Sequence, residues 1–268
     1  MTALAQLGDA NDLKACCAAV YESDWARLLL GPSLHPGGLS LTRQLGELLD
    51  LGPTSRVLDV AAGSGASARF LAETFGCRVV GLDYSDQAVE QANAASAADG
   101  LANRVRFRQG DAERLPFDDA SFDAILCECA FCTFPDKPTA AAEMARVLRP
   151  GGRLGLSDLT RAGSLPPELE GILAWVACIA DARPLDDYIT LLTEAGLMVD
   201  RVQKRDQVLG QTVNALRGRL LGAEMLIKLG QIELPGADFE QAKGIARSAT
   251  TAISQGQLGY ALLWAKRP

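Results

Sequence analysis

The stretch that decides the fold is R-V-L-D-V-A-A-G-S-G-A-S-A, residues 56–68. Its short apolar run, which ends at Asp59, predicts a buried strand, and the helical pattern from Arg69 onward predicts a helix after a turn of small residues. Gly63 and Gly65 have no side chain and tolerate positive φ, so the turn lets a backbone approach a ligand closely. The start of the helix offers unpaired N–H groups to an anion or polar group. We therefore expect a nucleotide-type binding turn here.

The absence of two motifs excludes two kinds of nucleotide site. A dinucleotide site needs G-x-G-x-x-G, and a phosphate-binding loop needs Lys-Ser or Lys-Thr after its last glycine; neither is in the sequence. The chain instead has Asp59 at the end of the first predicted strand, then the two glycines, then a second acid, Asp83, at the end of the next strand. This arrangement resembles the S-adenosylmethionine (SAM) turn of class I methyltransferases, and the resemblance implies SAM as the cofactor.

Length and composition exclude several classes of protein. At 268 residues the chain is long enough for one α/β domain with additions and a sizeable core. The net charge is −7 and the basic residues are scattered, so we expect no nucleic-acid partner. No run approaches the roughly 18 apolar residues of a membrane span, and no charged-then-apolar signal pattern opens the chain. Seven cysteines without a secretory signal argue against a disulfide framework, and we expect a cytoplasmic protein.

Strands alternate with helices through the middle of the chain. We predict strands at 56–60, 78–83, 105–109, 122–127 and 153–157, with helices between them. This alternation predicts a parallel sheet with helices on both faces, in which ligands bind beyond the carboxyl ends of the strands. The later elements that we predict are a strand at 197–202, helices at about 207–230 and 239–254, and a final strand at 259–264.

The resemblance to class I methyltransferases extends this prediction to the whole chain. It implies a Rossmann-like α/β fold with a mostly parallel, seven-stranded sheet whose last strand is antiparallel. We divide the chain into an N-terminal helical lid segment (1–52), a SAM-binding core (53–206 and 255–268) and a helical insertion or cap (207–254). Residues 160–184 of the core would form an acceptor-site insertion. The lid would fold over the cofactor and the substrate, as the corresponding segment does in many class I methyltransferases.

The acids at the predicted strand ends have distinct roles in this interpretation. Asp83 can accept hydrogen bonds from both ribose hydroxyls, and its alternative role as a helix cap is already filled by Ser85. Asp111 resembles the methyltransferase acid that accepts from the adenine amino group, with the N–H of Ala112 beside it. Ala61 stands where the family's turn often has its first glycine. The cofactor-binding residues that the resemblance implies are Asp59, Ala61, Gly63, Gly65, Asp83, Tyr84, Asp111, Ala112 and Glu128.

The cysteines after the fourth predicted strand suggest what is methylated. The run F-D-A-I-L-C-E-C-A-F-C-T-F-P-D-K-P, residues 122–138, resembles the S-N-C-V-x-N-L-x-P-D-K run of arsenite SAM methyltransferases and places Cys129 at their catalytic thiol. Further on, L-P-P-E followed by W-V-A-C places Cys178 at their next catalytic cysteine. The resemblance implies that Cys129 and Cys178 are catalytic and hold As(III). A third ligand could come from Cys132, or from Cys16 or Cys17 in the lid segment.

Thiol ligation suits this acceptor. Arsenic(III) is thiophilic, and thiolates select soft centres. Arsenic held by sulfur keeps a lone pair that can attack the SAM methyl group, so no base need remove a proton, and glutathione or another thiol could act as reductant. Because strand side chains alternate, we expect Cys127 and Cys129 to point the same way. The structural alternative is that these cysteines are small core residues, which is the interpretation we take for Cys77.

Two other functions stay open. The chain could methylate an oxygen, nitrogen or carbon of an organic acceptor, with His35 as an acid or base in an acceptor pocket that Trp175 also lines. In that case His35 or a tyrosine would be needed for turnover and the cysteines would be dispensable. Alternatively, the chain could bind SAM or a metalloid without catalysis. Either a monomer or a homodimer is compatible with the sequence.

Overall fold

The computed structural model of the protein describes residues 10–22, 35–169, 178–179, 181–229, 231 and 238–268. All structural statements below concern these residues. Within them, no helix has the length and apolar character that crossing a bilayer requires.

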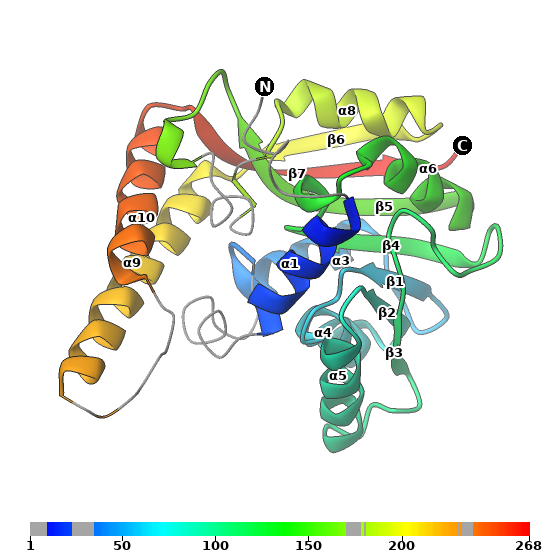
Figure 1. Ribbon diagram of the computed structural model, residues 1–268. Helices are drawn as coiled ribbons and strands as arrows, with labels where there is room; N and C mark the ends of the chain where they lie inside the picture. The colour runs from blue at the N-terminus through cyan, green and yellow to red at the C-terminus, as the bar shows by residue number, and fades with distance from the viewer. Residues whose placement is uncertain (1–9, 23–34, 170–177, 180, 230, 232–237) are drawn as a thin grey trace.

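The fold is built on one seven-stranded sheet with the strand order β3-β2-β1-β4-β5-β7-β6 (Figure 1). β7 runs antiparallel to both of its neighbours, whereas the other pairs are parallel. The strands are β1 (Arg56–Val60), β2 (Arg78–Asp83), β3 (Val105–Gln109), β4 (Phe122–Glu128), β5 (Leu148–Arg161), β6 (Met198–Lys204) and β7 (Leu258–Lys266). The predicted fold class, mostly parallel with an antiparallel last strand, is confirmed.

Helices cover both faces of the sheet. On one face, α3 (Gly38–Leu48) packs on α4 (Ala66–Phe75), and α5 (Asp86–Ala98) packs beside them on β2 and β3. On the other face, α6 (Lys137–Val147) packs on α8 (Leu185–Glu194), and α8 also packs on β6 (Figure 1). The short 3-10 turns η2 (Phe131–Thr133) and η3 (Pro167–Leu169) follow β4 and β5. Because both faces are covered, β1 and β4 are buried almost along their whole length and read as apolar runs.

Local sequence signals set several of these boundaries. The Ser85 hydroxyl caps α5 by accepting from the N–H of Ala88 at 2.9 Å, as the sequence predicts. Asp136 caps α6 in the same way through the N–H of Thr139. α4 ends at Gly76, whose φ of 71° lies in the left-handed region that favours glycine.

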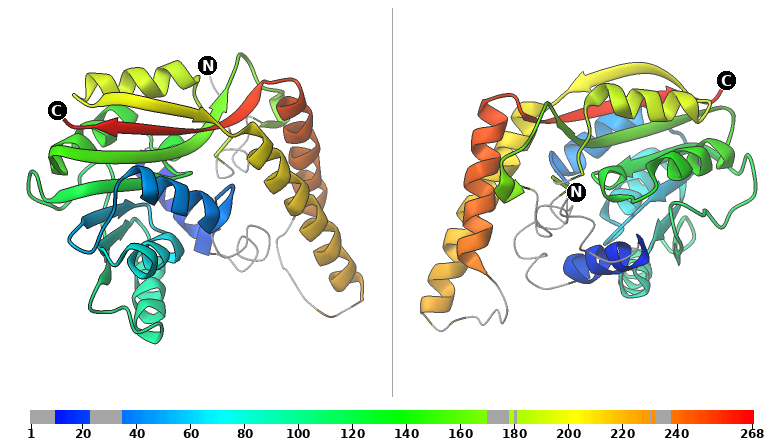
Figure 2. Two further views of the ribbon diagram at one scale, coloured as in Figure 1. Left: turned by 180° about the vertical axis from the view of Figure 1, so that it is seen from behind. Right: turned by 45° about the horizontal axis from the view of Figure 1, so that its top comes forward.

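Two helices lie between the last two strands, as the sequence predicts. α9 (Asp206–Lys228) leaves β6 and α10 (Phe239–Ser254) returns to β7, and the two pack against each other. They form a helical hairpin that extends away from the strands at one end of the sheet (Figure 2). The Asp206 carboxylate anchors the base of the hairpin by accepting from the N–H of Tyr260 at 2.9 Å. β5 is longer than predicted because Leu258–Lys266 pairs with it as far as Arg161.

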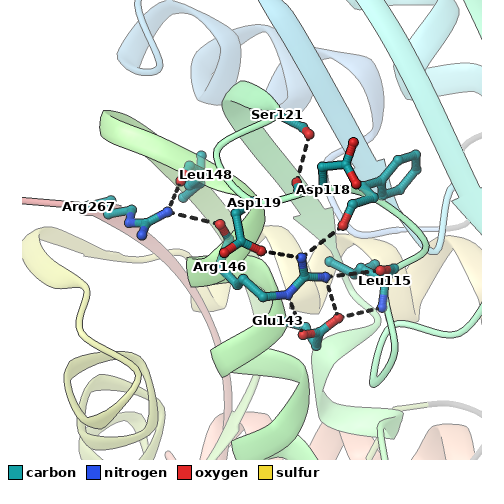
Figure 3. A network of polar contacts seen from close by, with 9 residues as sticks. Leu115, Asp118, Asp119, Ser121, Glu143, Arg146, Leu148 and Arg267 are labelled. Carbon is teal, nitrogen blue, oxygen red and sulfur yellow. Dashed lines mark hydrogen bonds and ion pairs between the residues drawn. The ribbon is translucent and has the colours of Figure 1, made fainter.

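The segment between β3 and β4 is held by Arg146 of α6 (Figure 3). Its guanidinium donates to the carbonyl oxygens of Leu115 and Phe117 and pairs with the carboxylates of Glu143 and Asp119, all at 2.7–3.0 Å. Since this segment follows Asp111, the arginine fixes the backbone next to a predicted cofactor residue.

Replacing Arg146 by lysine is expected to lower the free energy of unfolding by about 1–2 kcal/mol, because an ammonium group cannot reproduce the planar array of donors. Urea unfolding would measure the change, with Arg217→Lys on the exposed face of α9 as the matched control. Equal stability of the two variants would show that the arginine array does not support this segment.

Candidate active site

A cavity of about 580 Å³ lies at the carboxyl edge of the sheet. Its walls come from the turn after β1, the ends of β2 and β4, the residues after β3 and η2, and one face of α1 (Ala10–Glu22). The predicted cofactor residues that line it are Asp59, Ala61, Gly63, Asp83, Tyr84, Asp111, Ala112 and Glu128. Of the other predicted site residues, His35, Cys17 and Cys129 also line it.

The glycine turn after β1 is tightly packed from below. Gly65 is buried with a φ of 71°, and a β-carbon there would lie 2.3 Å from Cζ of Phe107. Ala61 also has a positive φ, 58°, in a region that an L-residue with a β-carbon adopts at a cost. The structure thus shows a strained alanine at the position where the family's turn often has its first glycine, and this strain explains why a glycine suits the position.

The two acids of β1 and β2 differ in how their oxygens are used. The Asp83 carboxylate faces the cavity and accepts from the N–H groups of Gly63 at 2.7 Å and Ser85 at 2.9 Å, so it fixes the turn. Each of its oxygens can accept a second hydrogen bond. Asp59 is buried, and its Oδ2 has no hydrogen-bond partner among the described residues. Burial, followed by the charges of Glu128 and Asp83, raises the pKa of Asp59 well above its usual range.

Asp111 follows β3 and lies at the cavity wall beside Ala112, as predicted. Its Oδ1 accepts from the N–H of Glu113 at 2.9 Å. Its Oδ2 lies 2.7 Å from Nζ of Lys14 in α1, and the same ammonium group pairs with Glu113. The sequence alone does not single out Lys14, although Lys14 shares a helix face with Cys17 and Tyr21, three and seven residues further on.

Glu128, at the end of β4, is the centre of a buried polar cluster. Its Oε2 accepts from Ser67 of α4 at 2.7 Å and from Thr42 of α3 at 3.0 Å. Nε2 of His35 lies 3.4 Å from the same oxygen and 3.3 Å from the Ser67 hydroxyl, and His35 Nδ1 lies 3.3 Å from the carbonyl oxygen of Pro36. The side chains of His35 and Glu128 are only 6% and 4% exposed. Ser67 and Thr42 were missed because a single hydroxyl in a helix has no distinctive spacing.

The structure brings Cys178 together with Cys129 and Cys132, which lie three residues apart in the segment after β4. The Cys178 thiol donates to the carbonyl oxygen of Cys129 at 3.1 Å when it is protonated, and the Tyr21 hydroxyl lies 3.6 Å from the Cys178 sulfur. The thiols of Cys129 and Cys132 can also donate to that sulfur, which lowers the pKa of Cys178. The same contact and burial raise the pKa of Cys129, and burial, followed by this contact, raises the pKa of Cys132. Cys178 therefore gives up the first proton that the cluster loses.

One expectation for the cysteines is wrong, and the positions of two other cysteines agree with what the sequence predicts. Cys127 and Cys129 do not point the same way: β4 ends at Glu128, and the backbone of Cys129 has a φ of 53°, so Cys127 is fully buried while Cys129 lines the cavity. Cys17 lines the cavity from α1. Cys77 is buried, in line with a core role, and burial raises its pKa to about 11.

In the part of the chain that the structure describes, no group of three or more His, Cys, Asp or Glu side chains has an arrangement that could hold a metal ion. Trp175 lies outside the described residues.

The residues at the cavity fit SAM in three respects. The orphan carboxyl oxygen of Asp59 can take a donor from a ligand, and a cationic group would favour its ionised form. Asp83 and Asp111 present carboxylates to the cavity from neighbouring strands. The turn at Gly63 exposes backbone close to the same space.

Known proteins resemble this chain along much of its length. The family described as a methyltransferase domain matches residues 58–156. The chain is 31% identical over 239 residues to 27-O-demethylrifamycin SV methyltransferase of Amycolatopsis mediterranei, covering 88% of this chain and 86% of that relative. It is 34% identical over 235 residues to O-methyltransferase cnsE of Penicillium expansum, covering 86% of this chain and 78% of the relative.

A solved structure supports the fold. Phosphoethanolamine N-methyltransferase 2 of Haemonchus contortus superimposes with a TM-score of 0.82 at 18% identity, over 98% of this chain and 61% of that one. At that identity the likeness concerns the fold alone.

Replacing Ala61 by glycine is expected to raise the free energy of unfolding by about 0.5–1 kcal/mol, because glycine adopts a positive φ without the β-carbon penalty. Ala120, outside the cavity, has a φ of 53° and should respond in the same direction. Ala94, on an exposed part of α5, should lose stability on the same replacement. Urea unfolding would measure the free energy of unfolding of all three variants. If Ala61→Gly loses as much stability as Ala94→Gly, the backbone at Ala61 is not strained.

Asp158 is expected to make stability depend on pH. Burial, followed by the charge of Cys178, raises its pKa from 3.8 to about 7. Between these values the unfolded chain is ionised and the folded chain is protonated, so this contribution to stability is full below about pH 4 and is lost as the pH rises to about 7. Asp158→Asn should therefore gain stability relative to the parent protein between pH 5 and pH 8.

Urea midpoints at the two pH values would measure this difference, with Asp118→Asn in an exposed turn as the control. A parallel pH response of Asp158→Asn and the parent protein would show that Asp158 ionises normally.

Proposed function

Because this chain belongs to the SAM-dependent methyltransferases, a family shown by relatives that match most of its length, we propose that it methylates a hydroxyl group of a small organic acceptor. The observation that carries this proposal is the buried pair of His35 and Glu128 in the cavity wall. Family membership identifies the protein as an enzyme, so the alternative of a non-catalytic binding protein is set aside.

The chain's own residues would hold SAM along the carboxyl edge of the sheet. Asp83 would accept from the ribose hydroxyls and Asp111 from the adenine amino group, with the N–H of Ala112 beside it. Asp59, whose Oδ2 lacks a partner among the described residues, would accept from the amino group of the methionine part. When bound, SAM supplies an electrophilic methyl group on a sulfonium centre.

A hydroxyl acceptor must lose its proton as the methyl group is transferred. Histidine is the side chain whose pKa best suits this task near neutral pH. In this proposal, the imidazole of His35 takes the proton, and the Glu128 carboxylate, 3.4 Å from Nε2, stabilises the imidazolium that forms. Hydrogen bonds from Ser67 and Thr42 hold Glu128 in place. The two relatives reported above are both named for methylation at an oxygen atom, which supports a hydroxyl acceptor.

Methylation of arsenite is the second candidate, and one observation favours it. Cys129 and Cys178, which the sequence pattern singled out separately, are in contact, with Cys132 beside them. Against it, the described residues offer no ready-made metal site, and the relatives reported above are not named for a metalloid. The organic acceptor is therefore the better supported of the two.

Release of S-adenosylhomocysteine (SAH) tests the proposal, with 27-O-demethylrifamycin SV as the hydroxyl probe. His35→Ala is expected to lower kcat by about 100-fold or more, the usual range for loss of a general base, while the Kd for SAM changes by less than about twofold. Cys129→Ser and Cys178→Ser are the matched controls in the same cavity region and should keep turnover.

Arsenite with glutathione is the second arm of this assay. Arsenite-dependent SAH that disappears in Cys129→Ser would transfer the assignment to the second candidate. Turnover of the hydroxyl probe by His35→Ala at the parent rate would remove His35 from the mechanism and leave the cofactor site in place.

A further inference from the structure

We propose that Lys14 is a positioning residue that clamps helix α1 to the adenine side of the cavity, so that holding the cofactor and closing α1 over it become one event. This inference rests on the proposed role of Asp111 toward the adenine amino group. It adds a residue from outside the strands and their turns to the cofactor site.

Lys14 makes a bridged ion pair with two acids of one turn. Its Nζ lies 2.7 Å from Oδ2 of Asp111 and also pairs with Glu113, and its side chain is only 10% exposed. Burial acts to lower the pKa of Lys14, but the bonds to the two carboxylates outweigh it and raise the pKa. The ammonium group is therefore charged at any physiological pH, and both contacts are charge-assisted.

The two acids are themselves held in fixed positions. Oδ1 of Asp111 accepts from the N–H of Glu113 at 2.9 Å, and Oε1 of Glu113 accepts from the N–H of Asp136 at 2.7 Å. Without Lys14, two neighbouring carboxylates would face each other with no cation between them. Lys14 thus holds the Asp111 carboxylate in one orientation. Because each carboxylate oxygen can accept two hydrogen bonds, an amino donor can join without displacing the lysine.

The same lysine fixes one end of α1. Lys14, Cys17, Ala18 and Tyr21 follow the helical spacing of a single face, and all four line the cavity. At the other end of that face the Tyr21 hydroxyl lies 3.6 Å from the Cys178 sulfur. α1 therefore reaches from the adenine-side turn to the cysteine cluster, across the front of the sheet edge (Figure 1).

Lys14→Met tests this role by SAM binding, which needs no acceptor. Titration calorimetry with SAM and with SAH should show affinities about tenfold weaker than in the parent protein, a change of about 1.4 kcal/mol. Stopped-flow measurements should show that most of the loss is in a faster dissociation rate, because α1 no longer stays closed. Lys14→Arg should restore affinity, since a guanidinium can bridge the same two carboxylates.

Two further measurements separate this role from a general loss of structure. Lys266→Met, at an exposed position of β7, is the matched control and should bind SAM as the parent protein does. In the Asp111→Asn background, Lys14→Met should weaken SAM much less than it does alone, because the two residues act through one contact.

The outcomes distinguish the inference from the proposal beneath it. Unchanged or tighter SAM binding by Lys14→Met, while Asp111→Asn weakens it, would overturn the role of Lys14 alone. SAM binding that Asp111→Asn leaves unchanged would overturn the adenine assignment of Asp111 and, with it, this inference. Additive losses in the double variant would show that Lys14 acts through another contact, which would also overturn it.

Discussion

Repulsion among carboxyl groups at one edge of the sheet is the interaction on which the site depends. β1 pairs in parallel with β2 and β4, so Asp59, Asp83 and Glu128 all reach the same edge. Backbone N–H groups compensate Asp83, and hydroxyl groups of α3 and α4 compensate Glu128. Asp59 keeps one oxygen without a partner among the described residues, and burial, followed by the charges of Glu128 and Asp83, raises its pKa. A ligand with a positive charge and several donors relieves this repulsion, and SAM has both.

Backbone strain gathers around the same cavity. Ala61, Cys129 and Cys178 all have positive φ values without being glycine. Such residues cost about 1–2 kcal/mol each and persist only where the surrounding structure holds them. At Cys129 the unusual backbone ends β4 and turns the side chain to the cavity wall. At Cys178 it accompanies contact with a segment far away in the sequence. The cysteine cluster is thus a product of chain geometry as much as of composition.

Helix α1 connects the two chemical ends of the cavity. Lys14 contacts the turn after β3, and Tyr21 contacts the cysteine cluster, so one short helix makes contacts at both ends of the cavity. His35, which precedes α3 in the chain, contacts Glu128 in the wall of the same cavity. The segments that precede the sheet in the chain therefore supply side chains to one side of the cavity, and the strand ends form the other side.

The sequence by itself determined the fold class, most strand positions, the glycine turn after β1 and the acids at the strand ends. Each of these depends on local periodicity, on glycine conformation or on the rule that parallel strands end at one edge. Only the tertiary structure decided that Ala61 is strained, that Cys127 and Cys129 diverge, and that Lys14, Thr42 and Ser67 reach the site. These depend on contacts between segments far apart in the chain. The sequence around a lone lysine or hydroxyl in a helix does not show which carboxylate that side chain will contact. The sequence of a strand likewise does not show in which direction the side chain that follows its last residue will point.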